Sequence, residues 1–133
     1  MRVKTKQKFY YMKTTTDILE KGTKEIVLAL IDAINKEDFQ TARSFVTNDF
    51  KFNGVLGARD GADAYFKDME EMKLKYDIKK SFSDGSDACI LYEIEMAGKK
   101  IFCSGWYHLR NHKVASLRVV FDPRPVLEAQ KKS

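Results

Sequence analysis

Apolar residues recur at steps of three and four in three segments of the first half of the chain, and this period predicts three amphipathic helices. The first helix ends near Asn35, the second is capped by Asp38, and the third opens at Gly61. Their apolar faces are formed, in order, by Ile26, Val27, Leu30, Ile31 and Ile34; by Phe39, Ala42, Phe45 and Val46; and by Ala62, Tyr65, Phe66, Met69 and Met72.

In the second half of the chain apolar residues alternate with polar ones, which is the period of a β-strand. The alternation begins at Leu74 and is interrupted by a turn at residues 83–86. The strands predicted after this turn span roughly 88–96, 100–109 and 114–122, and a shorter strand at residues 50–53 precedes the turn-prone segment 54–57. Helices first and antiparallel strands second predict the α+β class, with helices packed on a curved antiparallel sheet.

The register of the strands decides which side chains share a face of the sheet. A two-residue loop at 97–98 pairs Glu95 with Lys100, Ile94 with Ile101, Tyr92 with Cys103 and Ile90 with Gly105. A two-residue loop at 111–112 would put Arg118 opposite Gly105 on this apolar face. We therefore predict a three-residue loop at 110–112, which puts Leu117 there instead.

With these loops the two faces of the sheet differ in character. The face without charges contains Ala88, Ile90, Tyr92, Ile94, Met96, Ile101, Cys103, Gly105, Tyr107, Leu109, Ala115, Leu117, Val119 and Phe121, and we expect the helices to cover it. The other face mixes an aromatic centre with charged flanks, which is typical of a protein interface with a polar rim. We predict a homodimer through this outer face, with Trp106, Phe102, Leu91, Arg118 and His108 in the interface.

The composition changes this picture only at the N-terminus. The 133 residues have 24 Lys and Arg against 19 Asp and Glu, and five of the basic residues lie in the first 16, which have no acidic residue. The rest of the chain is formally neutral, so the net charge of +5 is no sign of a nucleic-acid-binding domain. We interpret residues 1–16 as a basic arm, flexible or loosely docked, with an added strand or a weak membrane-surface contact as alternatives.

The remaining composition favours a cytoplasmic protein without a cofactor. No apolar run approaches the roughly 20 residues of a membrane span, and the apolar stretch near the N-terminus is too short for a signal peptide, so we expect no membrane insertion. Cys89 and Cys103 are expected to be reduced, and no His or Cys pair has the spacing of metal ligands.

Four motifs and their order resemble the nuclear transport factor 2-like superfamily, and within it the SnoaL-like and ketosteroid-isomerase-like domains. They are the stretches 35–39, 47–50, 57–61 and 113–122, which read NKEDF, TNDF, GARDG and KVASLRVVFD. The resemblance implies a cone of three helices on a curved sheet, a cystatin-like roll. It implies one SnoaL-like domain at 17–125, followed by a C-terminal tail at 126–133.

The resemblance also implies where catalytic groups would lie. A ketosteroid-isomerase-like site needs a carboxylate base, a helical tyrosine and a protonated aspartic acid. The matching positions hold Asn53 or Gly54, Leu30 and Gly105, so we do not expect that isomerase chemistry. SnoaL-like cyclases resemble the chain more, and their acidic residue near the end of the last strand matches Asp122. Asp122 is therefore the catalytic candidate, with capping of the strand end as the alternative.

The interior of the predicted cone is the candidate binding site. Buried phenols need hydrogen-bond partners, which favours a mostly apolar small molecule with one or two polar handles, for example a carbonyl. Plain core packing remains the alternative for these residues, and a non-catalytic assembly module with a vestigial cavity is the alternative function for the domain. The candidate ligand-binding residues are Tyr92, Tyr107, Cys103, Asn53, Tyr65 and Phe121.

Overall fold

The computed structural model describes residues 15–132, and the side chains of residues 22–131. Three helices come first along the chain: α1 (Thr15–Asn35), α2 (Phe39–Ser44) and α3 (Ala62–Met72). Strands β1 (Val46–Asn53) and β2 (Ala58–Asp60) separate α2 from α3, and β3 (Asp77–Asp84), β4 (Asp87–Met96), β5 (Lys99–Arg110) and β6 (Lys113–Phe121) follow α3. The chain ends in α4 (Arg124–Lys132). The predicted arm at 1–16 lies outside the described residues, except that Thr15 and Thr16 begin α1.

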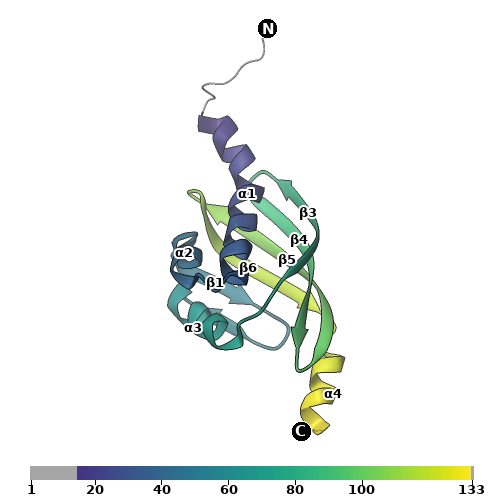
Figure 1. The fold of residues 1–133 in the computed structure, drawn as a ribbon. Coiled ribbons are helices and arrows are strands. Elements are labelled where there is room, and N and C mark those ends of the chain that lie inside the picture. The colour runs from purple at the N-terminus through teal and green to yellow at the C-terminus, as the bar shows by residue number, and fades with distance from the viewer. Residues whose placement is uncertain (1–14, 133) are drawn as a thin grey trace.

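The six strands form one curved sheet in the order β2-β1-β6-β5-β4-β3, and α1, α2 and α3 lie over its concave side (Figure 1). This arrangement confirms the predicted α+β cone. The sheet is antiparallel except between β1 and β6, which pair in parallel. The sequence pattern did not predict that pair, because it gave no partner to the first strand.

The helix ends follow the local sequence. The carboxylate of Asp38 accepts a hydrogen bond from the backbone N–H of Thr41 at 3.2 Å and so caps α2, as predicted. Gly61 precedes α3 with φ at +93°, a conformation that glycine adopts without strain. The second helix is shorter than its apolar period suggested, because Val46 already belongs to β1.

The β4–β5 hairpin has the predicted register. Tyr92 pairs with Cys103 and Ile90 with Gly105 across the 97–98 loop. The inner face of the sheet is buried along its length and joins the helices in one hydrophobic core. The helices therefore cover the face that the sequence assigned to them.

The predicted register of the β5–β6 hairpin is wrong. The loop has two residues, Asn111 and His112, both with positive φ, and Val119 rather than Leu117 pairs with Gly105. A bulge leaves Ala115 as an extra residue of β6, so Val114 and Ala115 are both buried. The bulge shifts the alternation back by one residue, which keeps Arg118 on the outer face.

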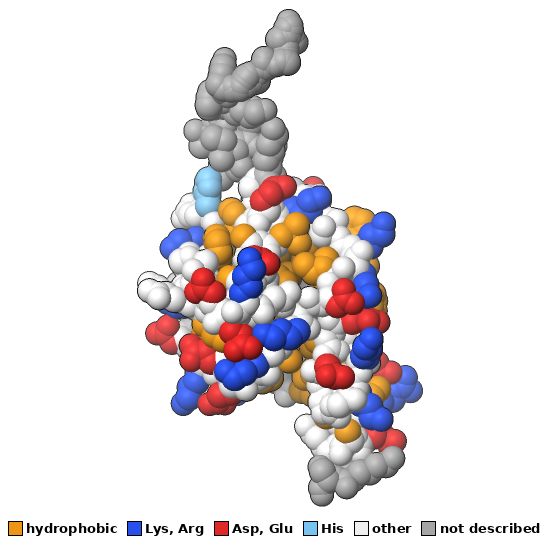
Figure 2. Space-filling view, in the orientation of Figure 1, with side chains coloured by type: hydrophobic (Ala, Val, Ile, Leu, Met, Phe, Trp, Pro, Cys, Tyr) orange, Lys and Arg blue, Asp and Glu red, His pale blue; other side chains and the backbone are white. Residues whose placement is uncertain are grey.

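The segment predicted as a C-terminal tail at 126–133 contains most of α4. Prolines are tolerated in the first turn of a helix, so Pro123 and Pro125 precede and start this helix instead of ending the fold. Val126 is buried in the hydrophobic core and attaches α4 to the domain. Lys, Arg, Asp and Glu side chains are interspersed over the helix side of the molecule (Figure 2).

Candidate functional site

A cavity of about 90 Å³ lies between α3 and the concave face of the sheet. Its wall is mostly apolar. The lining residues are Phe52 of β1; Tyr65, Asp68, Met69 and Met72 of α3; Leu74 and Tyr76 before β3; Ile94 and Met96 of β4; Cys103 of β5; and Leu117, Val119 and Phe121 of β6.

Tyrosines gather at the inner end of this cavity. Tyr65 lies against Phe50 and Phe52, with ring centroids 4.8 and 5.3 Å apart, and the ring of Tyr76 lies 4.7 Å from that of Tyr92. All three tyrosines are at least nine-tenths buried. Aromatic rings in such tilted contacts pack stably and hold their hydroxyl groups in fixed positions.

Burial keeps these phenols protonated. Burial raises the pKa of Tyr65 to about 12, although a side-chain hydrogen bond with Tyr76 lowers this pKa in part. The pKa of Tyr76 is raised well above its usual value, first by burial and then by Tyr65 and Tyr107. Burial also raises the pKa of the Cys103 thiol to about 11. At neutral pH these groups are therefore neutral donors and acceptors of hydrogen bonds.

Tyr92 and Tyr107 lie deeper than the cavity lining. Both are about 2% exposed, and burial raises the pKa of each. Both rings lie over Gly105. A Cβ atom there would lie 3.1 Å from Cε1 of Tyr107 and 3.4 Å from Cε2 of Tyr92, so the rings occupy the space of a side chain.

The structure brings together only some of the predicted ligand-binding residues. Tyr65, Cys103 and Phe121 line the cavity, whereas Tyr92 and Tyr107 pack behind it and Asn53 is exposed outside it. Sequence reasoning missed two lining residues with polar groups, Tyr76 and Asp68. Tyr76 carried a signal, because it alternates with Lys75 and Asp77 at the start of the second half.

The amide of Asn35 at the end of α1 holds Tyr76 in place. Asn35 Nδ2 donates to the carbonyl oxygen of Tyr76 at 3.0 Å, and the backbone N–H of Tyr76 donates to Asn35 Oδ1 at 2.7 Å. Lys75 Nζ adds an ion pair with Glu37 at 2.7 Å. The turn after α1 therefore fixes the segment that carries Tyr76 into the cavity wall.

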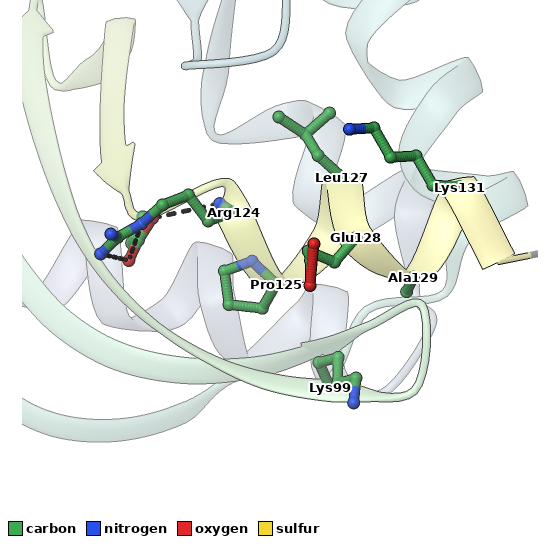
Figure 3. A pocket seen from close by; sticks show the side chains of 8 residues that line it. Lys99, Arg124, Pro125, Leu127, Glu128, Ala129 and Lys131 are labelled. Carbon is green, nitrogen blue, oxygen red and sulfur yellow. Dashed lines mark hydrogen bonds and ion pairs between the residues drawn. The ribbon is translucent and has the colours of Figure 1, made fainter.

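Asp122 lies outside the cavity and lines a surface groove of about 670 Å³. Figure 3 shows this groove between α4 and Lys99 at the start of β5. Its carboxylate accepts three hydrogen bonds from the Arg124 guanidinium, at 2.9, 3.1 and 2.6 Å, and one from the Arg124 backbone N–H at 3.1 Å. The Arg124 side chain and backbone lower the pKa of Asp122 to about 2. A general base needs a raised pKa and access to the ligand, so the geometry supports the capping alternative.

The outer face of the sheet carries the residues predicted for a dimer interface. Phe102, Trp106 and Val120 are each more than half exposed on it. Asp87 accepts hydrogen bonds from Nε1 of Trp106 at 2.8 Å and shares one with Nδ1 of His108 at 2.9 Å. His108 is thus tied to a surface carboxylate rather than to the cavity, and no described group of His, Cys, Asp and Glu could hold a metal ion.

The fold and the cavity define a cone-shaped α+β domain with an apolar interior that contains phenols. The model of the SnoaL-like domain matches residues 27–117. The chain belongs to this family, within the nuclear transport factor 2-like superfamily. Comparison with curated proteins gives no match, and no helix in residues 15–132 is long and apolar enough to cross a membrane.

Solved structures agree with this assignment. The chain is 42% identical to a nuclear transport factor 2-like protein of unknown function from Cytophaga hutchinsonii, with a TM-score of 0.76 over 89% of this chain and 99% of that one. An epoxide hydrolase of the LEH-like type from M. tuberculosis is 15% identical, with a TM-score of 0.69 over 85% and 92%. A Jannaschia protein proposed as a SnoaL-like polyketide cyclase is also 15% identical, with a TM-score of 0.72 over 90% and 96%. The last two similarities show the fold alone.

Proposed function

We propose that this protein binds a small, mostly apolar molecule with a carbonyl or similar acceptor oxygen in the cavity between α3 and the sheet. The observation that carries this proposal is the group of buried, protonated phenols beside an apolar wall. Such a wall takes up the apolar body of a ligand, and a phenol O–H donates to its oxygen.

The size of the cavity limits the ligand. About 90 Å³ is less than the roughly 300–1,000 Å³ typical of ligand sites. A ligand of ordinary size therefore requires the cavity to widen. Met69, Met72 and Met96 lie on its wall, and methionine adapts its shape easily because it is unbranched and has three rotatable bonds.

Native mass spectrometry of the protein as purified tests the proposal. We expect an added mass from a retained small molecule in the unmodified protein. Cys103→Leu fills part of the cavity and should abolish the added mass, whereas Cys89→Leu makes the same change on the opposite face of the sheet and should retain it. Thermal unfolding of both variants checks that they fold. Equal retention by folded Cys103→Leu and Cys89→Leu would contradict binding in this cavity.

We also propose that the protein is a homodimer through the outer sheet face. The exposed side chains of Phe102, Trp106 and Val120 support this, because a contiguous apolar patch with charged flanks is typical of an interface. Trp106→Lys should give a monomer at micromolar concentration. Leu127→Lys, on exposed α4, is the matched control and should leave the dimer intact. A monomeric unmodified protein would refute the interface.

A further inference from the structure

Asp68 is the one acidic side chain in the lining of the cavity among the described residues. It projects from α3, and its side chain is 34% exposed. Nε of Arg59 lies 2.7 Å from Oδ2 of Asp68, and the Arg59 side chain is about half exposed. The ion pair therefore lies where the cavity meets the surface, whereas Tyr65 and Tyr76 are buried.

The edge strand β2 places Arg59 beside this opening. Arg59 pairs with Phe52 of β1 in the antiparallel register. Residues directly opposite each other in such a pair point to the same face of the sheet, and Phe52 lines the cavity. Arg59 is thus directed to the face that α3 covers, where it contacts Asp68. The register of β1 and β2, rather than a chance surface contact, brings the two charges together.

The cavity therefore has different polar groups at its two ends. Its inner end offers phenol hydroxyls that can donate, and its outer end offers a carboxylate that only accepts. A carboxylate has about four acceptor positions, so contact with one guanidinium leaves Asp68 able to accept another hydrogen bond. Arg59 compensates the charge of Asp68, which favours a neutral donor such as a hydroxyl at this end. An anionic group there would meet the carboxylate and be repelled.

We propose that Asp68 determines the specificity of the cavity, and that its ligand is a small apolar molecule with a carbonyl at one end and a hydroxyl at the other. The hydroxyl donates to Asp68 while the carbonyl accepts from the inner phenols. This inference rests on the proposed binding function. It assigns Asp68 a role in ligand selection, and the residue has none in bond making or breaking.

Two ketones of nearly equal shape test the proposal, 4-hydroxyacetophenone and 4-methylacetophenone. Their affinities are measured by protein NMR titration, with chemical-shift changes at Cys103 and Tyr76 locating them in the cavity. A hydrogen bond to a charged group changes affinity by about tenfold or more. Because Asp68 is partly exposed, we expect the smaller effect: the unmodified protein should bind the hydroxy ketone about tenfold more tightly than the methyl ketone.

Asp68→Leu should remove this preference or reverse it, because a leucine prefers the methyl group. Asp63→Leu is the control: Asp63 lies on the same helix, pairs with Arg43 at 3.1 Å and is absent from the cavity lining. It should keep the tenfold preference. Asp68→Asn serves as a second variant that retains the shape and polarity of the side chain. Its preference for the hydroxy ketone should fall between that of the unmodified protein and that of Asp68→Leu.

The outcomes separate the two proposals. Equal binding of both ketones in the cavity of the unmodified protein would overturn the role of Asp68 and leave the binding function standing. A preference that survives in Asp68→Leu would also overturn it. If neither ketone shifted the resonances of cavity residues at millimolar concentration, the result would contradict the binding function. It would then also contradict the role of Asp68 in specificity.

Discussion

Replacing Asn35 by alanine tests how the cavity wall is held. The two hydrogen bonds between the Asn35 amide and the backbone of Tyr76 connect the end of α1 to the segment between α3 and β3. Tyr76 precedes β3, so its backbone N–H and C=O lie outside the helices and the strands. Alanine would leave both groups without their present partners in a partly buried position.

The magnitude follows from these two groups. A partly buried donor or acceptor that loses its partner costs about 1–3 kcal/mol, and water can reach one of the two once the amide is gone. We therefore expect Asn35→Ala to lower the free energy of unfolding by about 2–3 kcal/mol. At about 2.1 cal/mol/K per residue, the 133-residue chain has an unfolding entropy of about 0.28 kcal/mol/K, which converts this loss to about 7–11 °C in Tm.

Urea denaturation and thermal unfolding followed by circular dichroism measure the change. Asn53→Ala is the matched control, because Asn53 is exposed and its side chain makes no hydrogen bond to any described residue. Its free energy of unfolding should stay within about 0.5 kcal/mol of the unmodified protein. If Asn35→Ala stayed within the same limit, the contacts with Tyr76 would not hold the cavity wall and the reasoning would be refuted.

Three further predictions concern the inner sheet face and the end of β6. Gly105→Ala should cost about 1–3 kcal/mol in urea denaturation, because its Cβ would lie 3.1 Å from Tyr107; an unchanged stability would show that the ring has room to move. Arg124→Ala should raise the pKa of Asp122 from about 2 toward 3.8, as read from its carboxyl resonance by NMR. Because the folded-state pKa is the lower one, this ion pair stabilises the fold above about pH 4, and its contribution is lost as the pH falls toward 2; a midpoint near 3.8 in the unmodified protein would contradict it. Asp122→Asn should still retain the small molecule in native mass spectrometry, and loss of that molecule would show that Asp122 belongs to the binding site.

Local patterns predicted the β4–β5 hairpin but not the β5–β6 hairpin. Alternation and a two-residue loop suffice for the first, because no residue is inserted in either strand. In the second hairpin, the bulge adds Ala115 to β6. The predicted three-residue loop would shift the alternation of β6 by the same one residue. The faces were therefore predicted correctly, although Leu117 pairs with Tyr107 and not with Gly105.

The site was harder to predict than the fold because its polar groups depend on contacts between distant segments. Tyr65 and Cys103 could be placed in the cavity from the period of their own elements. The position of Tyr76 depends on the amide of Asn35, 41 positions earlier in the chain. The ion pair of Asp68 depends on the register of β2, an edge strand that the sequence pattern did not show. The helix after Pro123 was missed because prolines were interpreted only as breaks.

The glycine at position 105 connects the family resemblance with the proposed chemistry. In a ketosteroid-isomerase-like site this position would hold an acid that donates to an oxygen of the ligand. Here the rings of Tyr92 and Tyr107 close over the glycine, and the donors nearest the cavity are phenols with raised pKa values. The position that matches the isomerase base holds Asn53, which is exposed, or Gly54, and neither has a carboxylate. The acid on the cavity wall, Asp68, is paired with Arg59. A site with hydrogen-bond donors but no carboxylate base at that position favours binding of a carbonyl group over removal of a proton from the carbon beside it.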